Sequence, residues 1–322
     1  MPGIQINIGD VWKTVTGIQI NISDAWKVCV AGWINIGDVW KPFYLGAFGL
    51  FGGGFTTAVV DKYYFSSDGV TPGTSLGKAR YYLAAVGNTT VAIFGGGTWP
   101  ATGYTDKYTY STDAVAPGTV LAIARYGLGA AGNSTIGVFA EGTYIDGTYA
   151  FAAEKYTYSN DSVASGTLIN QSLYISAAGS STIGYFFSAY NTTKYTYSDD
   201  VISNGTTMGV NRYYSAATGQ GTMCIIGGGL VNISGGTYSN YTDKYTYSGD
   251  GVAAGTVLGL ARTKLAATGT STTGIFGGGN TGSATAYTDK YTFSGDSVAA
   301  STLLGTARYG LAGCSPASNG LT

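Results

Sequence analysis

The stretch RYGLGAAGNSTIGVFAEG (residues 125–142), followed by EKYTYSNDSVASGTLI (residues 154–169), decides the fold because it recurs along the chain. Each recurrence is marked by a lysine followed at once by tyrosine. These lysines stand 39 to 50 residues apart, at Lys62, Lys107, Lys155, Lys194, Lys244 and Lys290. A period of this length is typical of propellers and other repeat architectures. The six lysine–tyrosine pairs therefore predict six structural repeats between residue 44 and the C-terminus.

Each repeat contains four candidate strands and no helical periodicity. Examples are a small-residue strand (126–132), an apolar strand (135–139), a tyrosine strand beginning at Lys107, and a Thr-Val-Leu strand (119–123). Four short strands per repeat are typical of propeller blades, whose faces are buried only between neighbouring blades. The small residues suit innermost strands that crowd around the axis, so we expect a narrow axial channel.

The two ends of the repeat region complement each other. Residues 307–312 (ARYGLA) read as a first strand with no blade after it, whereas the segment beginning at Tyr44 lacks a first strand. Pairing the C-terminal strand with residues 44–80 would close the ring and leave few open sheet edges. We therefore predict an all-β protein with a six-bladed β-propeller over residues 44–322, closed by its C-terminal strand.

A shorter repeat occupies residues 1–43. The 14-residue unit GIQINIGDVWKTVT recurs as GIQINISDAWKVCVA and GWINIGDVWKPF. Apolar and polar residues alternate as in a strand, and Gly-Asp or Ser-Asp then interrupts the run before a second short strand. Three such β-hairpins are too small to bury their own apolar residues. We expect this region to serve attachment or oligomerisation through Trp12, Trp26 and Trp40.

The composition argues against several classes of function. Only 10% of the residues are charged, and 16 basic against 17 acidic side chains leave a net charge of −1, so we expect no nucleic-acid surface. The chain has no histidine, the usual catalytic base and neutral metal ligand. Its cysteines, Cys29, Cys224 and Cys314, form no metal-binding motif. We expect no catalytic residues, no metal and no cofactor.

The start of the chain, MPGIQINIGD, has neither the basic nor the apolar segment of a secretory signal peptide. No apolar run has the length of a membrane-spanning helix. We therefore expect synthesis in the cytoplasm without a signal peptide, and no membrane insertion.

Charged residues recur at fixed places in the predicted blades. In five repeats an arginine precedes the first strand and an acid begins the third. These two strands start at the same edge of a blade, about 10 Å apart, which predicts structural ion pairs. The residues concerned are Arg80, Arg125, Arg212, Arg262 and Arg308, with Asp61, Asp106, Glu154, Asp243 and Asp289. The fourth repeat instead has Asn170-Gln171 and Thr193.

A further acid follows each repeated lysine by six positions, in the predicted turn between the third and fourth strands. These acids are Asp68, Asp113, Asp161, Asp200, Asp250 and Asp296. Aspartate in such a turn usually accepts hydrogen bonds from its own backbone, so we expect local caps. The turns partly resemble the Asp box of sialidase propellers, but its later glycine and aromatic residue are missing. Glu141 and Glu154 are the only glutamates, which makes glycosidase activity the least favoured alternative.

Residues 44–315 resemble kelch-repeat propellers. The resemblance rests on the arginine before the first strand, on glycines such as Gly95-Gly96 that end the second, and on a third-strand tyrosine such as Tyr108. The tryptophan of the kelch fourth strand is absent. The resemblance implies the propeller fold and says little about function, because propellers carry many activities.

The predicted loops between second and third strands differ most among the repeats. Loops on a rigid scaffold are common recognition sites. Their aromatic residues lie among Asn, Thr and Ser, which suits sugar rings and protein surfaces equally. The alternative interpretation is that these rings pack within their own loops. The candidate binding residues are Trp99, Tyr104, Tyr144, Tyr149, Phe151, Tyr238, Tyr241 and Tyr287.

The INIGDVWK repeats resemble short repeats near the ends of virion proteins of tailed bacteriophages. This resemblance implies a non-enzymatic structural or binding protein of the virion, of the tail-fibre, receptor-binding or capsid-decoration type. Residues 1–43 would bind other virion proteins or self-associate, and the propeller loops would face a host-surface glycan or protein. An intracellular kelch-like interaction scaffold and, least favoured, a sialidase-like enzyme are the alternatives.

Overall fold

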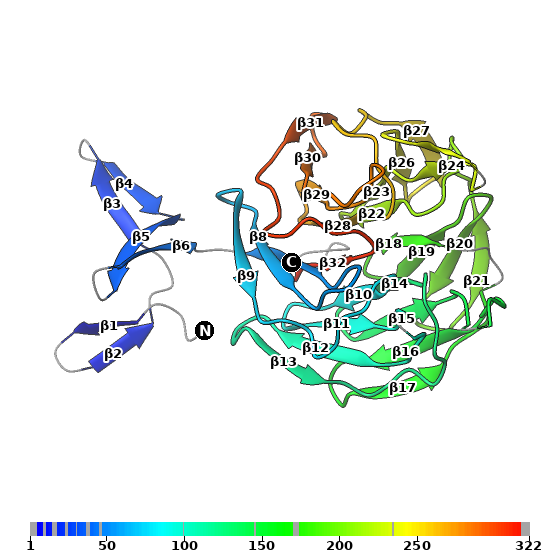
Figure 1. Cartoon of the computed structure of the whole chain (residues 1–322), viewed down its shortest axis with the longest axis horizontal. Coiled ribbons are helices and arrows are strands. Elements are labelled where there is room, and N and C mark those ends of the chain that lie inside the picture. Colours follow the sequence, from blue (N-terminus) through cyan, green and yellow to red (C-terminus); the bar gives the residue numbers. More distant parts are fainter. Residues whose placement is uncertain are drawn as a thin grey trace.

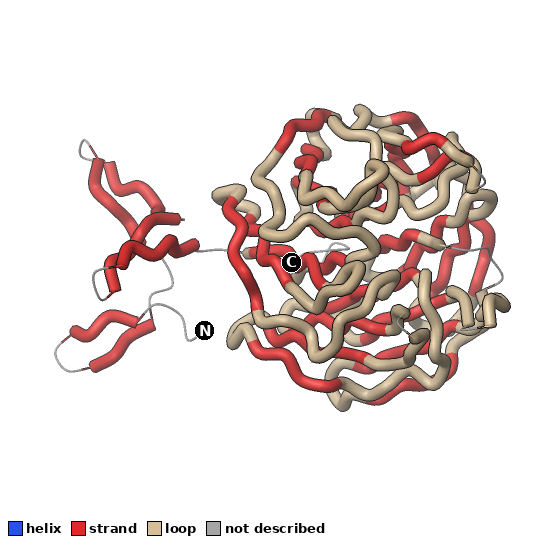
Figure 2. The backbone as a smooth tube through the Cα atoms, viewed as in Figure 1, coloured by secondary structure: helices blue, strands red, loops and turns tan. Residues whose placement is uncertain are grey.

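In the computed structural model, the described part of the chain consists of β-strands, turns and loops without a helix (Figure 2). The structure describes residues 47–98, 100–144, 146–169, 174–233 and 235–316, together with the backbone of six strands between residues 5 and 44. Within these ranges, no helix is long and apolar enough to cross a membrane.

The described residues form six four-stranded antiparallel blades arranged in a ring, as predicted (Figure 1). Each blade runs from an innermost first strand to a fourth strand at the rim. Blade one contains β32 (Ala312–Cys314), β7 (Phe48–Gly52), β8 (Val60–Tyr64) and β9 (Gly69–Gly73). Blade two contains β10 (Ala84–Gly87), β11 (Val91–Gly95), β12 (Thr105–Thr109) and β13 (Ala114–Pro117), and blade three contains β14 (Gly129–Gly132), β15 (Ile136–Ala140), β16 (Ala153–Thr157) and β17 (Ser162–Ser165).

The second half of the ring repeats this arrangement. Blade four contains β18 (Ser176–Gly179), β19 (Ile183–Phe187), β20 (Thr192–Thr196) and β21 (Ile202–Gly205). Blade five contains β22 (Ala216–Gly219), β23 (Met223–Gly227), β26 (Thr242–Thr246) and β27 (Gly251–Ala254), with a small hairpin of β24 (Leu230–Val231) and β25 (Thr237–Tyr238) between β23 and β26. Blade six contains β28 (Ala266–Gly269), β29 (Thr273–Gly277), β30 (Thr288–Thr292) and β31 (Ser297–Ala300).

The C-terminal strand closes the ring. Strand β32 pairs antiparallel with β7, with Ala312 opposite Gly52 and Cys314 opposite Leu50. The predicted closure is therefore confirmed. The innermost strands approach the axis closely and enclose cavities of about 30 and 90 Å³. Both cavities are lined by the small residues Ala85, Ala130, Ala177, Ala217, Ala267 and Gly313.

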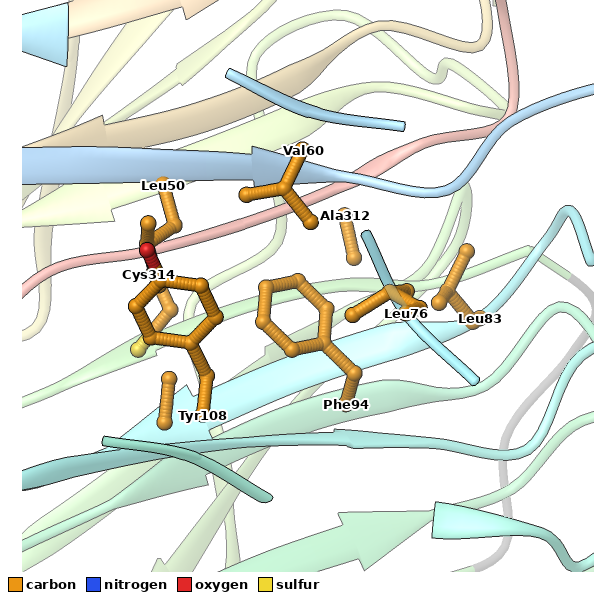
Figure 3. Close-up of a cluster of buried hydrophobic side chains, with 9 residues drawn as sticks. Leu50, Val60, Leu76, Leu83, Phe94, Tyr108, Ala312 and Cys314 are labelled. Carbon is orange, nitrogen blue, oxygen red and sulfur yellow. The ribbon is translucent and has the colours of Figure 1, made fainter. Parts of the chain in front are cut away.

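The apolar core is divided among the interfaces between neighbouring blades. Between blades one and two, Leu50 and Val60 pack against Phe94 and Tyr108 (Figure 3). Similar clusters occupy the other interfaces. The face of each blade is thus covered by its neighbour, which explains why a ring rather than an open stack suits this sequence.

The fourth strand begins earlier than the sequence analysis predicted. In blade two it is β13, directly after a tight turn at Asp113, whereas residues 119–123 form a loop. Leu121 of this loop is buried between blades two and three. The apolar residues of the expected Thr-Val-Leu strand therefore anchor a loop against the next blade.

The glycine triplets mark the closest approach of one blade to the next. In blade two, a Cβ atom on Gly95 would lie 2.7 Å from the Phe139 ring of blade three. Gly96 has a φ of 67°, and a Cβ there would lie 2.9 Å from the Arg125 carbonyl oxygen. Besides ending the second strand, the triplet therefore provides the space in which the next blade packs.

The described strands between residues 5 and 44 pair as antiparallel hairpins. These are β1 (Gln5–Ile8) with β2 (Val11–Thr14), β3 (Ile18–Ile22) with β4 (Ala25–Cys29), and β5 (Ala31–Ile36) with β6 (Val39–Tyr44). All share one register, which pairs Asn7 with Trp12, Asn21 with Trp26 and Asn35 with Trp40. The backbone confirms the hairpin prediction, and the tryptophan side chains lie outside the described part.

Candidate functional site

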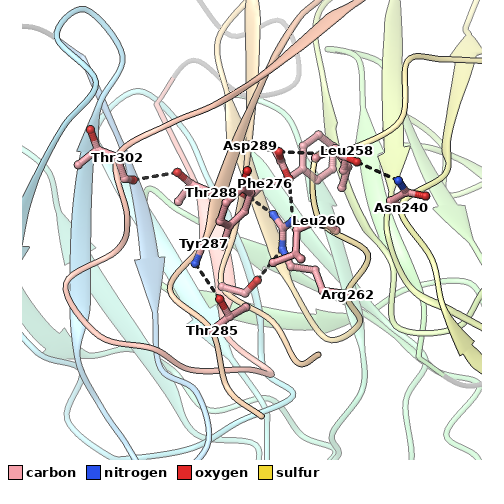
Figure 4. A network of polar contacts seen from close by, with 12 residues as sticks. Asn240, Leu258, Leu260, Arg262, Phe276, Thr285, Tyr287, Thr288, Asp289 and Thr302 are labelled. Carbon is pink, nitrogen blue, oxygen red and sulfur yellow. Dashed lines mark hydrogen bonds and ion pairs between the residues drawn. The ribbon is translucent and has the colours of Figure 1, made fainter. Parts of the chain in front are cut away.

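The repeated arginines and acids meet inside the blades. Guanidinium nitrogens lie 2.6–2.9 Å from carboxylate oxygens in the described pairs Arg308–Asp61, Arg80–Asp106, Arg125–Glu154, Arg212–Asp243 and Arg262–Asp289. Arg262 also donates to the Phe276 carbonyl oxygen at 3.0 Å (Figure 4). Burial lowers the pKa of Arg262, and the facing Asp289 carboxylate opposes that shift. The arginines are thus occupied within the framework.

Blade four departs from this arrangement. Thr193 stands in place of the acid and is buried. Asn170 and Gln171, predicted to replace the arginine, lie outside the described residues. In the other five blades the arginine lies four positions before the first strand. Counted in the same way from β18, the equivalent position of blade four in the sequence is Ser172.

The repeated lysines and turn aspartates join neighbouring blades. Each lysine pairs with the aspartate of the next blade in the described pairs Lys62–Asp113, Lys107–Asp161, Lys155–Asp200, Lys194–Asp250, Lys244–Asp296 and Lys290–Asp68. The last pair spans the closure of the ring. The tyrosine after each lysine donates its hydroxyl to the aspartate of its own blade, as Tyr156 does to Asp161 at 3.0 Å.

The prediction that these aspartates cap their own turns is therefore wrong. Side chains alternate along a strand, so the adjacent Lys and Tyr point to opposite faces of the blade. Each aspartate therefore accepts hydrogen bonds from a tyrosine of its own blade and from a lysine of the preceding blade. The aspartates have φ of 44° to 61°, a conformation that Asp tolerates better than most residues. Although burial alone would raise it, hydrogen bonds from Lys244 and Tyr291 lower the pKa of Asp296 to about 2.

The propeller has two unlike ends. Because first and second strands are antiparallel, Ala84 at the start of β10 pairs with Gly95 at the end of β11. The connections between blades and the loops from second to third strands therefore lie together at what we call the loop end. The hairpin turns after the first and third strands lie at the opposite end, which we call the turn end.

At the loop end, one position per blade lines a shared cavity of about 80 Å³. This position lies two residues before the start of the first strand, immediately before a leucine or isoleucine, or before the serine of blade five. The residues are Tyr82, Gly127, Tyr174, Tyr214, Lys264 and Gly310, all with φ between 55° and 69°. Backbone hydrogen bonds join neighbours, including Tyr82 N to Gly310 O at 2.7 Å and Lys264 N to Tyr214 O at 3.0 Å. Left-handed backbone costs roughly 1–2 kcal/mol at each non-glycine position, so the closed ring must hold it in place.

Tyrosine rings pack together over this cavity. The Tyr174 and Tyr214 rings are stacked with centroids 3.9 Å apart, and the Tyr82 centroid lies 5.8 and 5.6 Å from them. The Lys264 ammonium lies 5.1–5.5 Å from the ring centroids of Tyr82, Tyr214 and Tyr309. Burial lowers the pKa of Lys264 and raises that of Tyr82.

A larger hollow of about 570 Å³, which we call the axial hollow, opens beside this cluster. Its tyrosine walls are Tyr81, Tyr82, Tyr126, Tyr174 and Tyr214, and the blade-two loop contributes Thr98, Pro100 and Ala101. Phe55 extends the aromatic surface, because its exposed ring stacks on Tyr309 and meets the edge of Tyr81, each with centroids 5.1 Å apart.

The aromatic residues predicted for binding are not brought together. Tyr104 and Tyr287 lie against Arg80 and Arg262, with guanidinium carbons 5.1 and 5.4 Å from their ring centroids. Tyr144 is half-buried beside a separate pocket in blade three. Exposed rings on the loops of blades three and five are Tyr149, Phe151, Tyr238 and Tyr241. Trp99 lies outside the described residues.

The sequence-based prediction places the candidate binding residues at the loop end but does not include the tyrosines that gather around the axis there. The available signal was the dipeptide after each arginine, which reads Tyr-Tyr at 81–82, Tyr-Gly at 126–127, Tyr-Tyr at 213–214, Thr-Lys at 263–264 and Tyr-Gly at 309–310. In a ring, the second of these positions meets its equivalents at the axis. Different residues at this position in different blades therefore alter the surface around the axis while the strands of each blade stay the same.

Glu141 is a buried acid outside the axial hollow. It replaces the middle glycine of the triplet in blade three and has a φ of 59°. Its side chain is 2% exposed, and neither carboxylate oxygen has a hydrogen-bond partner among the described residues. Burial raises the pKa of Glu141 to about 9, which the Arg125 charge only partly offsets. This carboxyl group is therefore mostly neutral at pH 7.

No protein-family model matches the chain, and no curated protein matches it. In the described ranges, no group of three His, Cys, Asp or Glu side chains lies close enough together to hold a metal ion. The axial hollow offers aromatic faces, hydroxyl groups and a nearby ammonium, a set suited to binding by stacking, hydrogen bonding and charge.

Proposed function

We propose that this protein is a non-enzymatic binding protein of a bacteriophage virion, whose propeller recognises a host-surface ligand at its loop end and whose residues 1–43 attach it to the particle. The observation that carries the binding proposal is the axial hollow. Half-buried tyrosines from several blades converge there on a closed framework. Tyrosine provides a rigid apolar face and a hydroxyl group, a combination favoured at recognition surfaces.

The framework makes the hollow suitable for recognition. Tyr82, Tyr174 and Tyr214 stand on left-handed backbone positions held by hydrogen bonds between blades, so their arrangement exists before a ligand arrives. A preformed site loses less conformational freedom on binding. Small-ligand sites usually have volumes of roughly 300–1,000 Å³, a range that includes the axial hollow.

The attachment proposal rests on the N-terminal repeats. Their sequence resembles short repeats of phage virion proteins, and their described strands form hairpins of one register. Isolated two-stranded hairpins are marginally stable in water, which favours a covering partner: another virion protein or a further copy of this chain. The proposed relation of the blades to kelch repeats rests on the arginine, glycine and tyrosine positions described above.

Mass spectrometry of purified particles tests the virion assignment. We expect peptides of this protein in washed particles, and we expect a chain lacking residues 1–43 to be absent from them. Absence of the full chain from particles, with recovery in a complex with a cytoplasmic partner, would instead support an intracellular scaffold.

Competition for the host surface tests the binding assignment. We expect purified full-length protein to slow particle adsorption in proportion to its concentration. A propeller of unrelated sequence is the control. Unchanged adsorption at saturating protein would contradict a role in host recognition.

A further inference from the structure

We propose that the axial hollow binds a carboxylate-bearing sugar, with the tyrosines stacking on the sugar ring and the Lys264 ammonium pairing with the carboxylate. This inference deepens the proposed function and rests on it, because it names the ligand class of the same site.

Lys264 differs from the other described lysines in its surroundings. The repeated lysines pair with aspartates of the next blade, and Lys78 is exposed. Lys264 is half-buried at the loop end, and no described acid lies within ion-pair distance of it. Partial burial of an ammonium without an anion is unfavourable. A ligand carboxylate would supply the missing counter-charge.

The tyrosines around Lys264 suit a pyranose. Tyr82, Tyr174 and Tyr214 line both the small cavity that includes Lys264 and the axial hollow beside it. A sugar lying on these rings would therefore stand next to the ammonium. Pyranose rings present an apolar face to aromatic side chains and a rim of hydroxyl groups to polar ones. Tyrosine meets both requirements with one side chain.

Other ligand classes fit less well. The Lys264 ammonium already lies 5.1–5.5 Å from the ring centroids of Tyr82, Tyr214 and Tyr309, so a cationic ligand beside these rings would be repelled by a like charge. Nucleic acid is usually bound through several basic side chains along its phosphates. All five arginines pair with acids of their own blades, whereas Lys264 has no described acid within ion-pair distance.

Titration calorimetry of the full-length protein tests this inference. The probes are oligosaccharides ending in glucuronate, galacturonate or N-acetylneuraminate, each compared with its counterpart in which the carboxyl group is reduced to an alcohol. We expect at least one acidic probe to bind, and its reduced form to bind at least about tenfold more weakly. K264M should remove that difference while keeping the wild-type melting temperature, and K264R should largely retain it. K78M is the matched control, because it removes a loop-end charge outside the hollow and should leave binding unchanged.

Three results would overturn the inference while leaving the proposed function standing, provided the protein still blocks particle adsorption. One is equal binding of acidic and reduced probes with no effect of K264M. Another is no binding of any acidic probe, which would direct attention to neutral glycans or to acidic peptides. Acidic probes that bind wild type and K264M equally well would also overturn it. Failure of the protein to enter particles or block adsorption would contradict the proposed function independently of the sugar measurement.

Discussion

The turn end and the loop end of the propeller are built from the same repeats, but equivalent positions hold the same residues at the turn end and different residues at the loop end. At the turn end, each described blade has an aspartate of left-handed backbone conformation after its third strand, joined to a lysine of the preceding blade. At the loop end, the equivalent axial positions hold tyrosine, glycine or lysine. Repeated residues therefore maintain the ring, whereas residues that differ between blades shape the surface available for recognition.

The two kinds of ion pair also differ in their surroundings. The arginine–acid pairs are buried within blades, as at Arg262 and Asp289, whose side chains are 0% exposed. Apart from Lys62, which is buried, the lysine–aspartate pairs join blades nearer the solvent, as at Lys244 and Asp296, which are 27% and 35% exposed. Charges removed from water depend on their partners far more than charges that water can still reach.

The largest expected effect comes from opening the ring. A chain ending at residue 307 lacks β32 and the Arg308–Asp61 pair, and it exposes the inner edge of β7. We expect this chain to lose cooperative thermal unfolding and to aggregate, as measured by circular dichroism and size-exclusion chromatography. A chain ending at Pro316 is the control and should behave as the full chain does. A native melting curve for the shorter chain would contradict closure by β32.

Breaking a buried pair should have the next largest effect. Arg262→Ala leaves the Asp289 carboxylate buried without its main partner, which should lower the free energy of unfolding by about 3–5 kcal/mol in urea titrations. Replacing both residues with apolar side chains of similar size should cost less than the single change. A loss below about 1 kcal/mol for Arg262→Ala would contradict a large dependence of the buried Asp289 carboxylate on Arg262.

Glu141 offers a change in the opposite direction. Glu141→Gly restores the residue of the other triplets, relieves a backbone strain of roughly 1–2 kcal/mol and removes a buried acid, so it should stabilise the protein. Burial raises the pKa of Glu141 to about 9 in the folded protein. Below about pH 4.5 this carboxyl group is protonated in both the folded and the unfolded state, and it costs no stability by ionising. As the pH rises toward 9 the unfolded state loses this proton first, so the folded protein becomes less stable.

The advantage of Glu141→Gly should therefore grow between about pH 4.5 and 9, measured by urea unfolding at several pH values. Glu141→Gln keeps the strained backbone and removes the ionisation. It should share the pH dependence of the glycine variant while remaining less stable. A constant difference between wild type and Glu141→Gln across this range would show that the carboxyl group is not buried as described.

The smallest expected effect lies at the turn end. Lys244→Ala should lower the free energy of unfolding by at most about 1 kcal/mol, and salt should reduce the difference. The pKa of Asp296 is lowered to about 2, so the stability it contributes is present above about pH 4 and is lost as the pH falls toward 2. Lys244→Ala should flatten this acid decline. A cost as large as that of Arg262→Ala would remove the distinction between the two kinds of pair.

The repeats made much of this fold predictable. The lysine–tyrosine period and the unmatched strand at 307–312 specify the number of blades and their closure, and the matching positions of arginine and acid indicate which charges meet. The fourth strand was misplaced because Leu121, buried from a loop, has the same apolar character as a strand residue. Local propensity does not distinguish the two.

The site was less predictable because it is assembled across the ring. Tyr82, Tyr174 and Tyr214 are far apart in the sequence, and their rings meet only when the blades close around the axis. The variable loops predict Tyr104 and Tyr287 as binding residues, whereas both rings lie against framework arginines. For this ring, comparing equivalent positions between blades is more informative than the composition of each loop.

The most direct test replaces axial tyrosines with glycine, the residue found at the same position in blades one and three. In the full-length protein, Tyr174→Gly combined with Tyr214→Gly should leave the melting temperature at or above that of wild type, because glycine accepts the left-handed backbone. The measurement is the ability of this variant to block particle adsorption to host cells. We predict that blocking is lost while the fold is kept, and undiminished blocking would contradict recognition by the axial tyrosines.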